Sequence, residues 1–213
     1  MKIESFPRKL FLFRNNLCMF AQTQNELHNM KHMSILAVSL LALVACTPEK
    51  KQEADYSQYV NPMIGTDFTG NTYPGAQVPF GMVQLSPDNG LPGWDRISGY
   101  FYPDTTIAGF SHTHLSGTGA GDLYDISFMP VTRPYKEAPA PLGIYSTFSH
   151  NDEAASAGYY RVLLKDYNIN VELTATERCG IQRYTFPEAE ASVFLNLKKA
   201  MNWDFTLDSK IEV

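Results

Sequence analysis

The chain has 213 residues and carries 17 Lys and Arg against 22 Asp and Glu, so its formal net charge is −5 at pH 7. Beyond residue 45 it is more acidic, with twelve basic against twenty acidic side chains, which argues against a nucleic-acid partner. The cysteines, at positions 18, 46 and 179, fit neither a disulfide framework nor a zinc site. Cys179 lies in a strand-like run, so we expect a buried structural thiol rather than a nucleophile.

The first 45 residues resemble a secretion signal behind an upstream extension. A short basic start at Met30 leads into an apolar run, 33–45, which is shorter than the ~20 residues of a membrane-spanning helix. This region closes on the sequence LVAC, which resembles a bacterial lipobox. We therefore expect residues 30–45 to be a lipoprotein signal peptide, with a buried core helix as the alternative. Residues 1–29 are then a spurious upstream extension or an unusually long leader.

The lipobox resemblance makes Cys46 the expected lipidation site and the first residue of the mature protein. Residues 46–55 are charged and polar, which predicts a flexible tether between the lipid and a folded domain. Thr47 does not resemble an inner-membrane retention signal. The expected location is therefore the outer membrane of a Gram-negative bacterium, with the lipid anchor in the membrane and the domain facing the periplasm or the cell surface.

Residues 56–213 have the pattern of an all-β domain. The first half is rich in Gly and Pro, which is typical of turns, and residues 86–94 read as a loop. Short strands are expected in this half at 80–85, 98–102, 107–110 and 126–131. After a second loop region at 132–150, apolar and polar residues alternate in four runs, at 159–165, 169–174, 181–186 and 191–197. Strands at intervals of ~8–12 residues predict an antiparallel β-sandwich or barrel.

The last residues predict that this β domain is incomplete. Residues 208–213, DSKIEV, begin an alternating strand that no turn or cap closes. A strand cut in this way leaves an unpaired sheet edge, which proteins usually avoid. We therefore expect the chain to be a fragment of a longer protein.

The stretch 109–130, GFSHTHLSGTGAGDLYDISFMP, carries a dense set of polar side chains among glycines. Glycines let a backbone approach a ligand closely, and polar residues crowded on a loop are often functional. His112 and His114 alternate, so on an extended chain they would face the same side and reach one ligand or one metal. With Asp122 or Asp125 they would form a plausible metal set. The other interpretation is that these histidines form hydrogen bonds that hold the loop.

Two earlier loops add candidate binding residues. Gly65 and Thr66 lie in the segment NPMIGT, where a glycine allows close backbone approach or simply a tight turn. Trp94 lies between a glycine and Asp95, so its indole could stack on a sugar ring or belong to the core. The carboxylate of Asp95 could bind hydroxyl groups or cap a turn.

Four segments occur in an order that resembles a known family. They are YVNPMIGT, YPGAQVPFGMVQLSPD, GYFYPDTTIAGFSHTHLSGTG and DISFMP, over residues 59–130. Together they resemble the N-terminal domain of glycoside hydrolase family 92, the calcium-dependent exo-acting α-mannosidases. Tyr124 departs from the pattern, since many relatives are expected to carry a glycine there. The resemblance implies a galactose mutarotase-like β-sandwich, followed by a larger helical toroid that this chain lacks, with the active site between the two.

The resemblance also implies a chemistry. The family inverts the anomeric centre with a carboxyl acid and a carboxylate base that lie ~6.5–9.5 Å apart. Calcium, which accepts oxygen ligands, holds the mannose hydroxyls. The acid, the base and the calcium ligands lie mainly in the helical part, so no catalytic or metal-binding residue is assigned in this chain. The sandwich is expected to contact mannose-rich glycans, such as those of glycoproteins, through Gly65, Thr66, Trp94, Asp95, His112 and His114.

Two other functions are compatible with the sequence. A non-catalytic carbohydrate-binding lipoprotein would use the sandwich alone, and a stop codon directly after Val213 would favour it. A metal-dependent hydrolase would use His112, His114 and Asp122, and it predicts activity of this chain with added zinc or manganese.

Overall fold

The computed structural model describes residues 54–139, 142–188, 190–197 and 207–212. They belong to one unit of the chain, Ala54–Val213. The predicted upstream extension, the signal peptide, the lipidation site at Cys46 and nearly all of the tether lie outside the described residues. Within the described ranges, no helix is long and apolar enough to cross a membrane.

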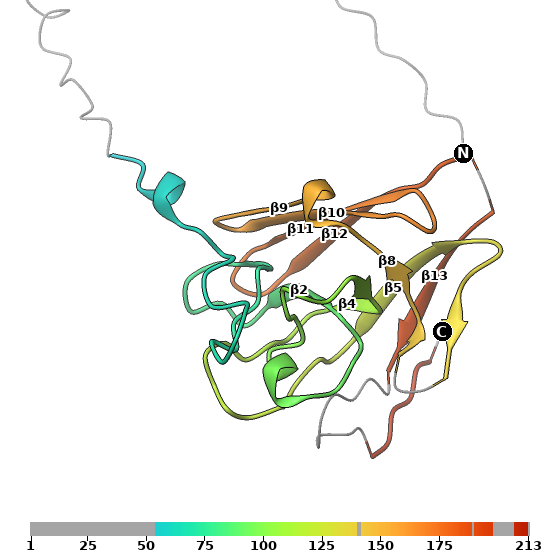
Figure 1. The fold of residues 1–213 in the computed structure, drawn as a ribbon, viewed down its shortest axis with the longest axis horizontal. Coiled ribbons are helices and arrows are strands. Elements are labelled where there is room, and N and C mark those ends of the chain that lie inside the picture. Colours follow the sequence, from blue (N-terminus) through green and yellow to red (C-terminus); the bar gives the residue numbers. More distant parts are fainter. Residues whose placement is uncertain (1–53, 140–141, 189, 198–206, 213) are drawn as a thin grey trace, which may run out of the picture. The chain divides into compact units, whose positions relative to one another are not determined.

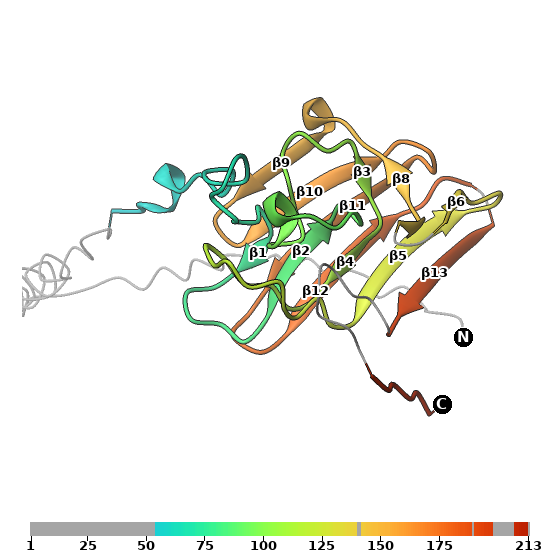
Figure 2. The same cartoon turned by 60° about the horizontal axis from the view of Figure 1, so that its bottom comes forward.

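Two antiparallel sheets face each other and form a sandwich (Figure 1, Figure 2). The first sheet has the order β1-β2-β4-β5-β13, with bounds Ala76–Gln77, Gln84–Asp88, Gly109–Ser111, Ser127–Thr132 and Ala191–Asn196. The second sheet has the order β12-β11-β10-β9, with bounds Gly180–Thr185, Ile169–Ala175, Tyr159–Leu164 and Glu153–Ser156. The predicted fold class, an all-β antiparallel sandwich, is confirmed.

The core lies between the two sheets and follows from alternation along the strands. The second sheet buries Tyr160, Val162 and Leu164 from β10 and Ile169, Val171 and Leu173 from β11. The first sheet adds Leu85, Phe110 and Val131 to the same cluster. Successive side chains of a strand point to opposite faces, so every second residue enters the core. Burial of each such side chain contributes about 1.5–3 kcal/mol.

The four strands predicted in the second half of the chain are confirmed. They are β10, β11, β12 and β13. The strand predicted at 126–131 is also confirmed, since β5 begins and ends within one residue of it. Each of the strands β10 and β11 has one face in the core and the other toward solvent, and this arrangement produces the alternating pattern that the sequence shows.

The first half of the chain differs more from prediction. The strand predicted at 80–85 and the loop predicted at 86–94 are both displaced, because β2 runs from Gln84 to Asp88. The strand predicted at 98–102 is wrong, since these residues follow the 3-10 helix η2 (Trp94–Arg96) as a turn and irregular chain.

A single residue, Asn89, accounts for the missing strand. The Asn89 N–H donates to the Gly99 carbonyl at 2.8 Å, and the Asn89 side-chain oxygen accepts from the Phe101 N–H. The backbone groups that a neighbouring strand would bind are therefore satisfied inside a loop. Asn side chains compete with sheet ladders in this way.

Short elements connect the two sheets. The strand predicted at 107–110 is divided between β3 (Thr106–Ile107) and β4, and the Ala108 N–H between them donates to the Asp88 carbonyl at 2.8 Å. The region predicted as a loop at 132–150 contains strands as well. They are β8 (Ser146–Thr147), which pairs with β3, and the hairpin of β6 (Glu137–Ala138) and β7 (Gly143–Ile144). The other 3-10 helices are η1 (Ser57–Tyr59) and η3 (His150–Asp152).

Two further predictions are wrong. Cys179 is exposed, because it lies in the turn between β11 and β12, where its N–H donates to the Thr176 hydroxyl at 3.2 Å. Residues 208–212 form no strand. A strand needs a neighbouring backbone to bind, and in the described part of the chain no strand pairs with this segment.

A buried carboxylate joins β9 to β10 and to the turn at Tyr100. The Glu153 side chain is fully buried and accepts the hydroxyl of Tyr160 at 2.6 Å and that of Tyr100 at 3.0 Å. The Nδ1 atom of His150 lies 2.6 Å from the same carboxylate. Burial, with the nearby Glu153 carboxylate, raises the pKa of Tyr160 well above its usual range, so its hydroxyl remains a donor. Several donors are what makes a buried carboxylate tolerable.

We predict that Tyr160→Phe lowers the free energy of unfolding by about 1–3 kcal/mol, because a buried carboxylate loses a donor. The matched control is Tyr159→Phe, which removes the hydroxyl that Tyr159 donates to Glu172 at 2.6 Å. That pair lies on the outer side of the sheet, so we expect the control to cost less than about 1 kcal/mol. Urea unfolding of both variants tests the prediction, and equal losses would contradict it.

Candidate functional site

Three loops that the sequence singles out are held together next to β2 and β4 (Figure 1). They are residues 61–72, 92–96 and 113–124. The Gly117 N–H donates to the Asn71 carbonyl at 2.6 Å, which joins the third loop to the first. Gly119 lies against the indole of Trp94, since a Cβ atom at Gly119 would be 3.1 Å from the ring. The structure therefore places the predicted tryptophan, the NPMIGT segment and the glycine-rich loop in one region.

Trp94 is at the surface of the domain. The residue is 55% exposed, and it is the first residue of η2. A core position, which was the alternative for this indole, is excluded. A large, half-exposed aromatic ring on an anchored loop is available to stack on an apolar sugar face.

An ion pair anchors the helix that carries Trp94. The Arg96 Nε atom donates to Asp104 Oδ2 at 2.6 Å, and Arg96 Nη2 bonds the other carboxylate oxygen. The guanidinium also lies over the Phe101 ring, 4.8 Å from its centroid. Hydrogen bonding to Asp104 raises the pKa of Arg96 above its usual range. Asp95, the residue before Arg96, is partly buried. The fork-like contact between Arg96 and Asp104 therefore fixes the loop on which both predicted sugar-binding residues, Trp94 and Asp95, lie.

Gly65 and Thr66 form a tight turn. Gly65 has φ +84°, and a Cβ atom there would come within 2.9 Å of Thr72, so the position requires glycine. The Thr66 hydroxyl donates to the Met63 carbonyl at 2.9 Å, and the Thr66 carbonyl accepts from the Tyr102 N–H at 2.9 Å. The hydroxyl and the carbonyl of Thr66 are therefore used to shape the loop and to join it to the segment around Tyr102.

His114 is inside the domain. Its ring is fully buried, with Nδ1 donating to the Gln84 carbonyl at 2.7 Å. The Nε2 atom lies 2.9 Å from Asp88 Oδ1 and 3.0 Å from the Ser111 hydroxyl. Both ring nitrogens are used within the protein, so this histidine holds the loop and is not placed to contact a ligand from solvent.

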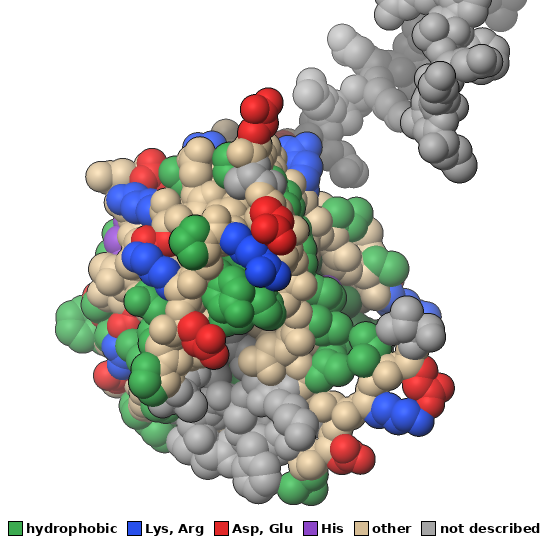
Figure 3. Space-filling view, turned by 90° about the vertical axis from the view of Figure 1, so that its right-hand side faces the viewer, with side chains coloured by type: hydrophobic (Ala, Val, Ile, Leu, Met, Phe, Trp, Pro, Cys, Tyr) green, Lys and Arg blue, Asp and Glu red, His purple; other side chains and the backbone are tan. Residues whose placement is uncertain are grey.

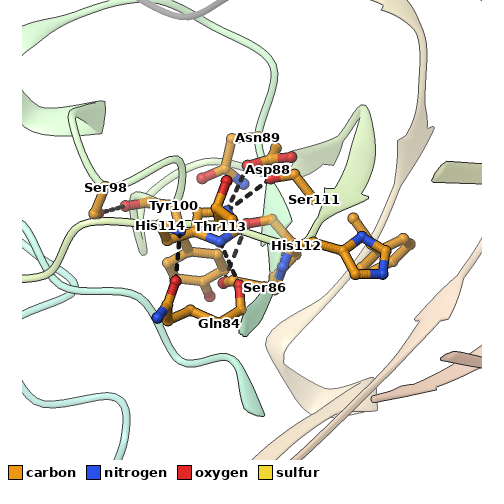
Figure 4. Close-up of polar contacts among 12 residues, drawn as sticks. Gln84, Ser86, Asp88, Asn89, Ser98, Tyr100, Ser111, His112, Thr113 and His114 are labelled. Atoms are coloured by element: carbon orange, nitrogen blue, oxygen red, sulfur yellow. Dashed lines mark hydrogen bonds and ion pairs between the residues drawn. The ribbon is translucent and has the colours of Figure 1, made fainter. Parts of the chain in front are cut away.

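His112 points elsewhere. Figure 4 shows its ring directed away from that of His114, toward the opposite side of the strand end. Its Nδ1 donates to the Ile126 carbonyl at 2.9 Å, and its ring packs against the Phe128 ring with the two centroids 5.5 Å apart. The prediction that the two histidines face the same side is wrong. The reason is that β4 ends at Ser111 and the chain bends at His112, so strand alternation stops before the pair.

The acidic residues do not complete a metal site with these histidines. Asp122 Oδ1 accepts from the Leu123 N–H at 2.7 Å, and Asp125 Oδ2 accepts from the Thr113 hydroxyl at 3.0 Å. Among the residues that the structure describes, no group of three or more His, Cys, Asp or Glu could hold a metal ion. The metal-dependent hydrolase reading therefore has no geometric support.

The His112 ring lines a hollow of about 290 Å³ between the two sheets. Its other walls come from Phe128, Gly180, Gln182, Tyr184 and Val193, on β5, β12 and β13. Figure 3, which views the domain from the right-hand side of Figure 1, shows hydrophobic side chains gathered near the middle of that face. The structure thus assigns His112 to the gap between the sheets rather than to the loops around Trp94.

A second hollow, of about 390 Å³, was not anticipated as a unit. It is lined by Asn61, Met63, Thr66, Asp67, Tyr102 and His150. The segment NPMIGT was a candidate in the sequence, and Asp67 follows it directly. Tyr102 and His150 are distant in the sequence, and no motif connects them to this segment. Only the folded chain brings the three segments together.

The turn before β5 is conformationally strained. Leu123, Tyr124 and Ile126 have φ values of +80°, +68° and +55°, in the left-handed region that favours glycine. Tyr124 is fully buried, and its ring packs edge-on against His114 at 5.7 Å. This aromatic contact offsets the backbone cost at the position where the resemblance predicts a glycine. Ile126 is β-branched, which raises the cost of a positive φ. It is also 49% exposed, so its side chain gains less from packing than that of Tyr124.

Comparison with known proteins decides the family. Residues 59–213 match the model of the glycosyl hydrolase family 92 N-terminal domain. The chain belongs to glycoside hydrolase family 92. Its strands, its three site loops and both hollows lie within the matched range.

Three relatives of this family 92 chain illustrate the match. A family 92 α-mannosidase of Bacteroides thetaiotaomicron is 44% identical, with a TM-score of 0.64 over 68% of this chain and 20% of its own. A family 92 inverting mannosidase of the same organism is 30% identical, with a TM-score of 0.55 over 68% and 20%. An uncharacterized secreted glycosidase of Arthroderma benhamiae is 26% identical over 76% of this chain and 21% of its own length. The chain therefore spans about a fifth of the proteins it matches.

We predict that Ile126→Gly in this family 92 domain raises the free energy of unfolding by about 0.5–1 kcal/mol, because glycine adopts positive φ without strain. The matched control is Ile181→Gly on β12, where a similarly exposed isoleucine, at 58%, has ordinary strand geometry. There glycine weakens the strand, and we expect a loss of similar size. Thermal unfolding tests both variants. A loss of stability in Ile126→Gly would show that the turn is not strained.

Proposed function

We propose that this chain is the N-terminal sandwich of an inverting, calcium-dependent α-mannosidase that acts on mannose-rich glycans of glycoproteins. The observation that carries the proposal is the 44% identity to an α-mannosidase over 68% of this chain. A second relative is named an inverting mannosidase, which supports the stereochemical part. Membership of family 92 is independent of these finer statements.

In this proposal the sandwich supplies substrate contacts and not the acid or the base. Trp94 stacks on a mannose ring, and Asp95 accepts hydrogen bonds from sugar hydroxyls. Gly65 and Thr66 shape the neighbouring backbone through the contacts described above. The catalytic carboxyl groups belong to the remaining four-fifths of the family architecture, in the helical part that would pack on this domain.

Calcium is not part of the role assigned to this domain. The described residues contain no group of three or more carboxylates and imidazoles that could hold a metal ion. This proposal therefore assigns the ion no ligand set among the described residues. In the proposed enzyme, the ion that would hold the mannose hydroxyls is bound mainly by the rest of the polypeptide.

We further propose that the protein is exported and anchored in the outer membrane of a Gram-negative bacterium through a lipid on Cys46. A relative described as a secreted glycosidase supports export. The lipobox-like sequence LVAC supports the lipid. Metabolic labelling with a palmitate analogue would test this, since Cys46→Ser should abolish incorporation.

The proposal is tested by offering α-linked mannobiose to the purified chain, with calcium and then with a chelator. We expect no turnover in either condition, because the acid and base are assigned outside this chain. Calcium-dependent turnover would contradict that assignment and move the chemistry into the sandwich. Binding without turnover is also the behaviour of a non-catalytic carbohydrate-binding module, and the downstream reading frame separates the two.

We predict that Trp94→Ala weakens mannobiose binding by the chain about tenfold, because the flat ring supplies stacking and buried apolar area. Trp94→Phe keeps a flat ring and should retain most of the affinity. Tyr135→Ala, which removes a partly exposed ring that packs on Phe194, is the matched control and should bind as the parent does. Calorimetric titration measures all three, and an unchanged affinity in Trp94→Ala would remove the residue from the sugar site.

A further inference from the structure

The hollow lined by Asn61, Tyr102 and His150 is built from three segments that are bonded to one another. The Tyr102 N–H donates to the Thr66 carbonyl at 2.9 Å, and the Tyr102 carbonyl lies 2.7 Å from His150 Nε2. The rings of Tyr102 and His150 stack with centroids 3.9 Å apart and planes at 8°. The hollow therefore has fixed walls, although its residues come from distant parts of the sequence.

The His150 wall is fixed from behind. Its Nδ1 lies 2.6 Å from the buried Glu153 carboxylate, which also accepts the hydroxyls of Tyr100 and Tyr160. Both ring nitrogens of His150 thus face oxygen atoms of the protein. The histidine acts here as a support for the Tyr102 ring and offers the hollow no nitrogen of its own.

Two polar side chains at the hollow retain unused hydrogen-bonding capacity. Asn61 Oδ1 accepts from the Met63 N–H at 3.0 Å, and this leaves the Asn61 amide NH₂ as a donor. Asp67 Oδ1 accepts from the Phe68 N–H at 2.7 Å, and this leaves Asp67 Oδ2 as an acceptor. Among the described residues, neither remaining group has a partner. Each loop hydrogen bond also holds its side chain in a defined orientation.

The aromatic wall complements these groups. His150 covers one side of the Tyr102 ring, and Tyr102 as a whole residue remains 39% exposed. Met63 adds an apolar surface to the lining. The lining therefore combines an aromatic ring and an apolar side chain with polar side chains, and a few placed polar groups of this kind fix the orientation of a bound small ligand.

We propose that this hollow is a saccharide-contact site that takes one neutral hexopyranose unit of a glycan. A pyranose offers hydroxyl donors for Asp67, hydroxyl acceptors for the Asn61 amide and C–H groups for the Tyr102 ring. A free carboxylate disfavours an anionic ligand. The inference relies on the proposed glycan-binding function only for the class of ligand, and it adds residues that lie outside the Trp94 loop.

The test is an amide and indole chemical-shift titration of the purified chain with methyl α-D-mannopyranoside. We expect shifts of the amide signals of Asn61, of residues 63–67 and of Tyr102. Asp67→Asn should weaken the affinity read from these amides at least about tenfold, because a charged acceptor is lost. The Phe68 N–H keeps an oxygen partner in this variant, so the loop should remain folded. Asn61→Asp similarly keeps the Met63 contact and removes the NH₂ donor.

The control is Glu190→Gln, which removes an exposed carboxylate paired with Arg133. It should leave the titration unchanged. Equal weakening in Glu190→Gln and Asp67→Asn would overturn the inference, because the effect would then come from net charge. Shifts at the hollow with calcium chloride but not with the glycoside would also overturn it.

The readouts separate this inference from the proposed function. Shifts of the Trp94 indole N–H alone, with the amides from Asn61 to Asp67 unmoved, would support sugar binding at Trp94 and overturn the hollow as a sugar site. Shifts at the hollow alone would support the inference and count against Trp94 as a contact. An absence of shifts at both positions would overturn both.

Discussion

The buried imidazole of His114 is the contact on which the loop end of the sandwich depends. It donates to the carbonyl of Gln84 on β2 and lies within hydrogen-bond distance of Asp88 and Ser111, on β2 and β4. Polar groups buried at this depth must be satisfied, because water cannot replace a lost partner. The ring therefore fixes the path of the chain that leaves β4. The glycine-rich loop that lies against Trp94 continues from this fixed start and is held further along by the bond from the Gly117 N–H to the Asn71 carbonyl.

The other loops of the site are secured by the same kind of contact. The Arg96 guanidinium and the Asp104 carboxylate hold η2, while the buried Glu153 carboxylate holds the wall formed by His150. In each case a charged or aromatic side chain inside the domain positions a more exposed residue. A binding surface made of such loops benefits from this rigidity, since an ordered loop loses little entropy when it binds. The sandwich thus acts as a rigid support for a small set of surface loops.

The strained turn at Leu123, Tyr124 and Ile126 shows the cost of this arrangement. Three non-glycine residues in the left-handed region are unfavourable, and they persist because the surrounding packing determines their conformation. The buried Tyr124 ring packs against His114, so part of the strain is offset by the same histidine. Backbone strain and the buried polar cluster therefore belong to one structural unit at the start of β5.

The sequence by itself determined the class of fold, the family and the strands β10 to β13. These features follow from local information, because alternation with a period of two records which side chains of a strand face the core. The motif series over residues 59–130 identified the family for a similar reason, since it is read along the chain. Trp94 was also selected as a candidate from local sequence, although its exposure was left open.

Only the tertiary structure decided what depends on partners that are distant in sequence. The segment 98–102 is not a strand because Asn89 binds its backbone, and His112 and His114 diverge because the chain bends where β4 ends. The hollow exists because His150 reaches the carbonyl of Tyr102, 48 residues earlier, and Tyr102 binds the carbonyl of Thr66. Side-chain hydrogen bonds between remote segments leave no periodic trace in a sequence, which is why these features required the folded chain.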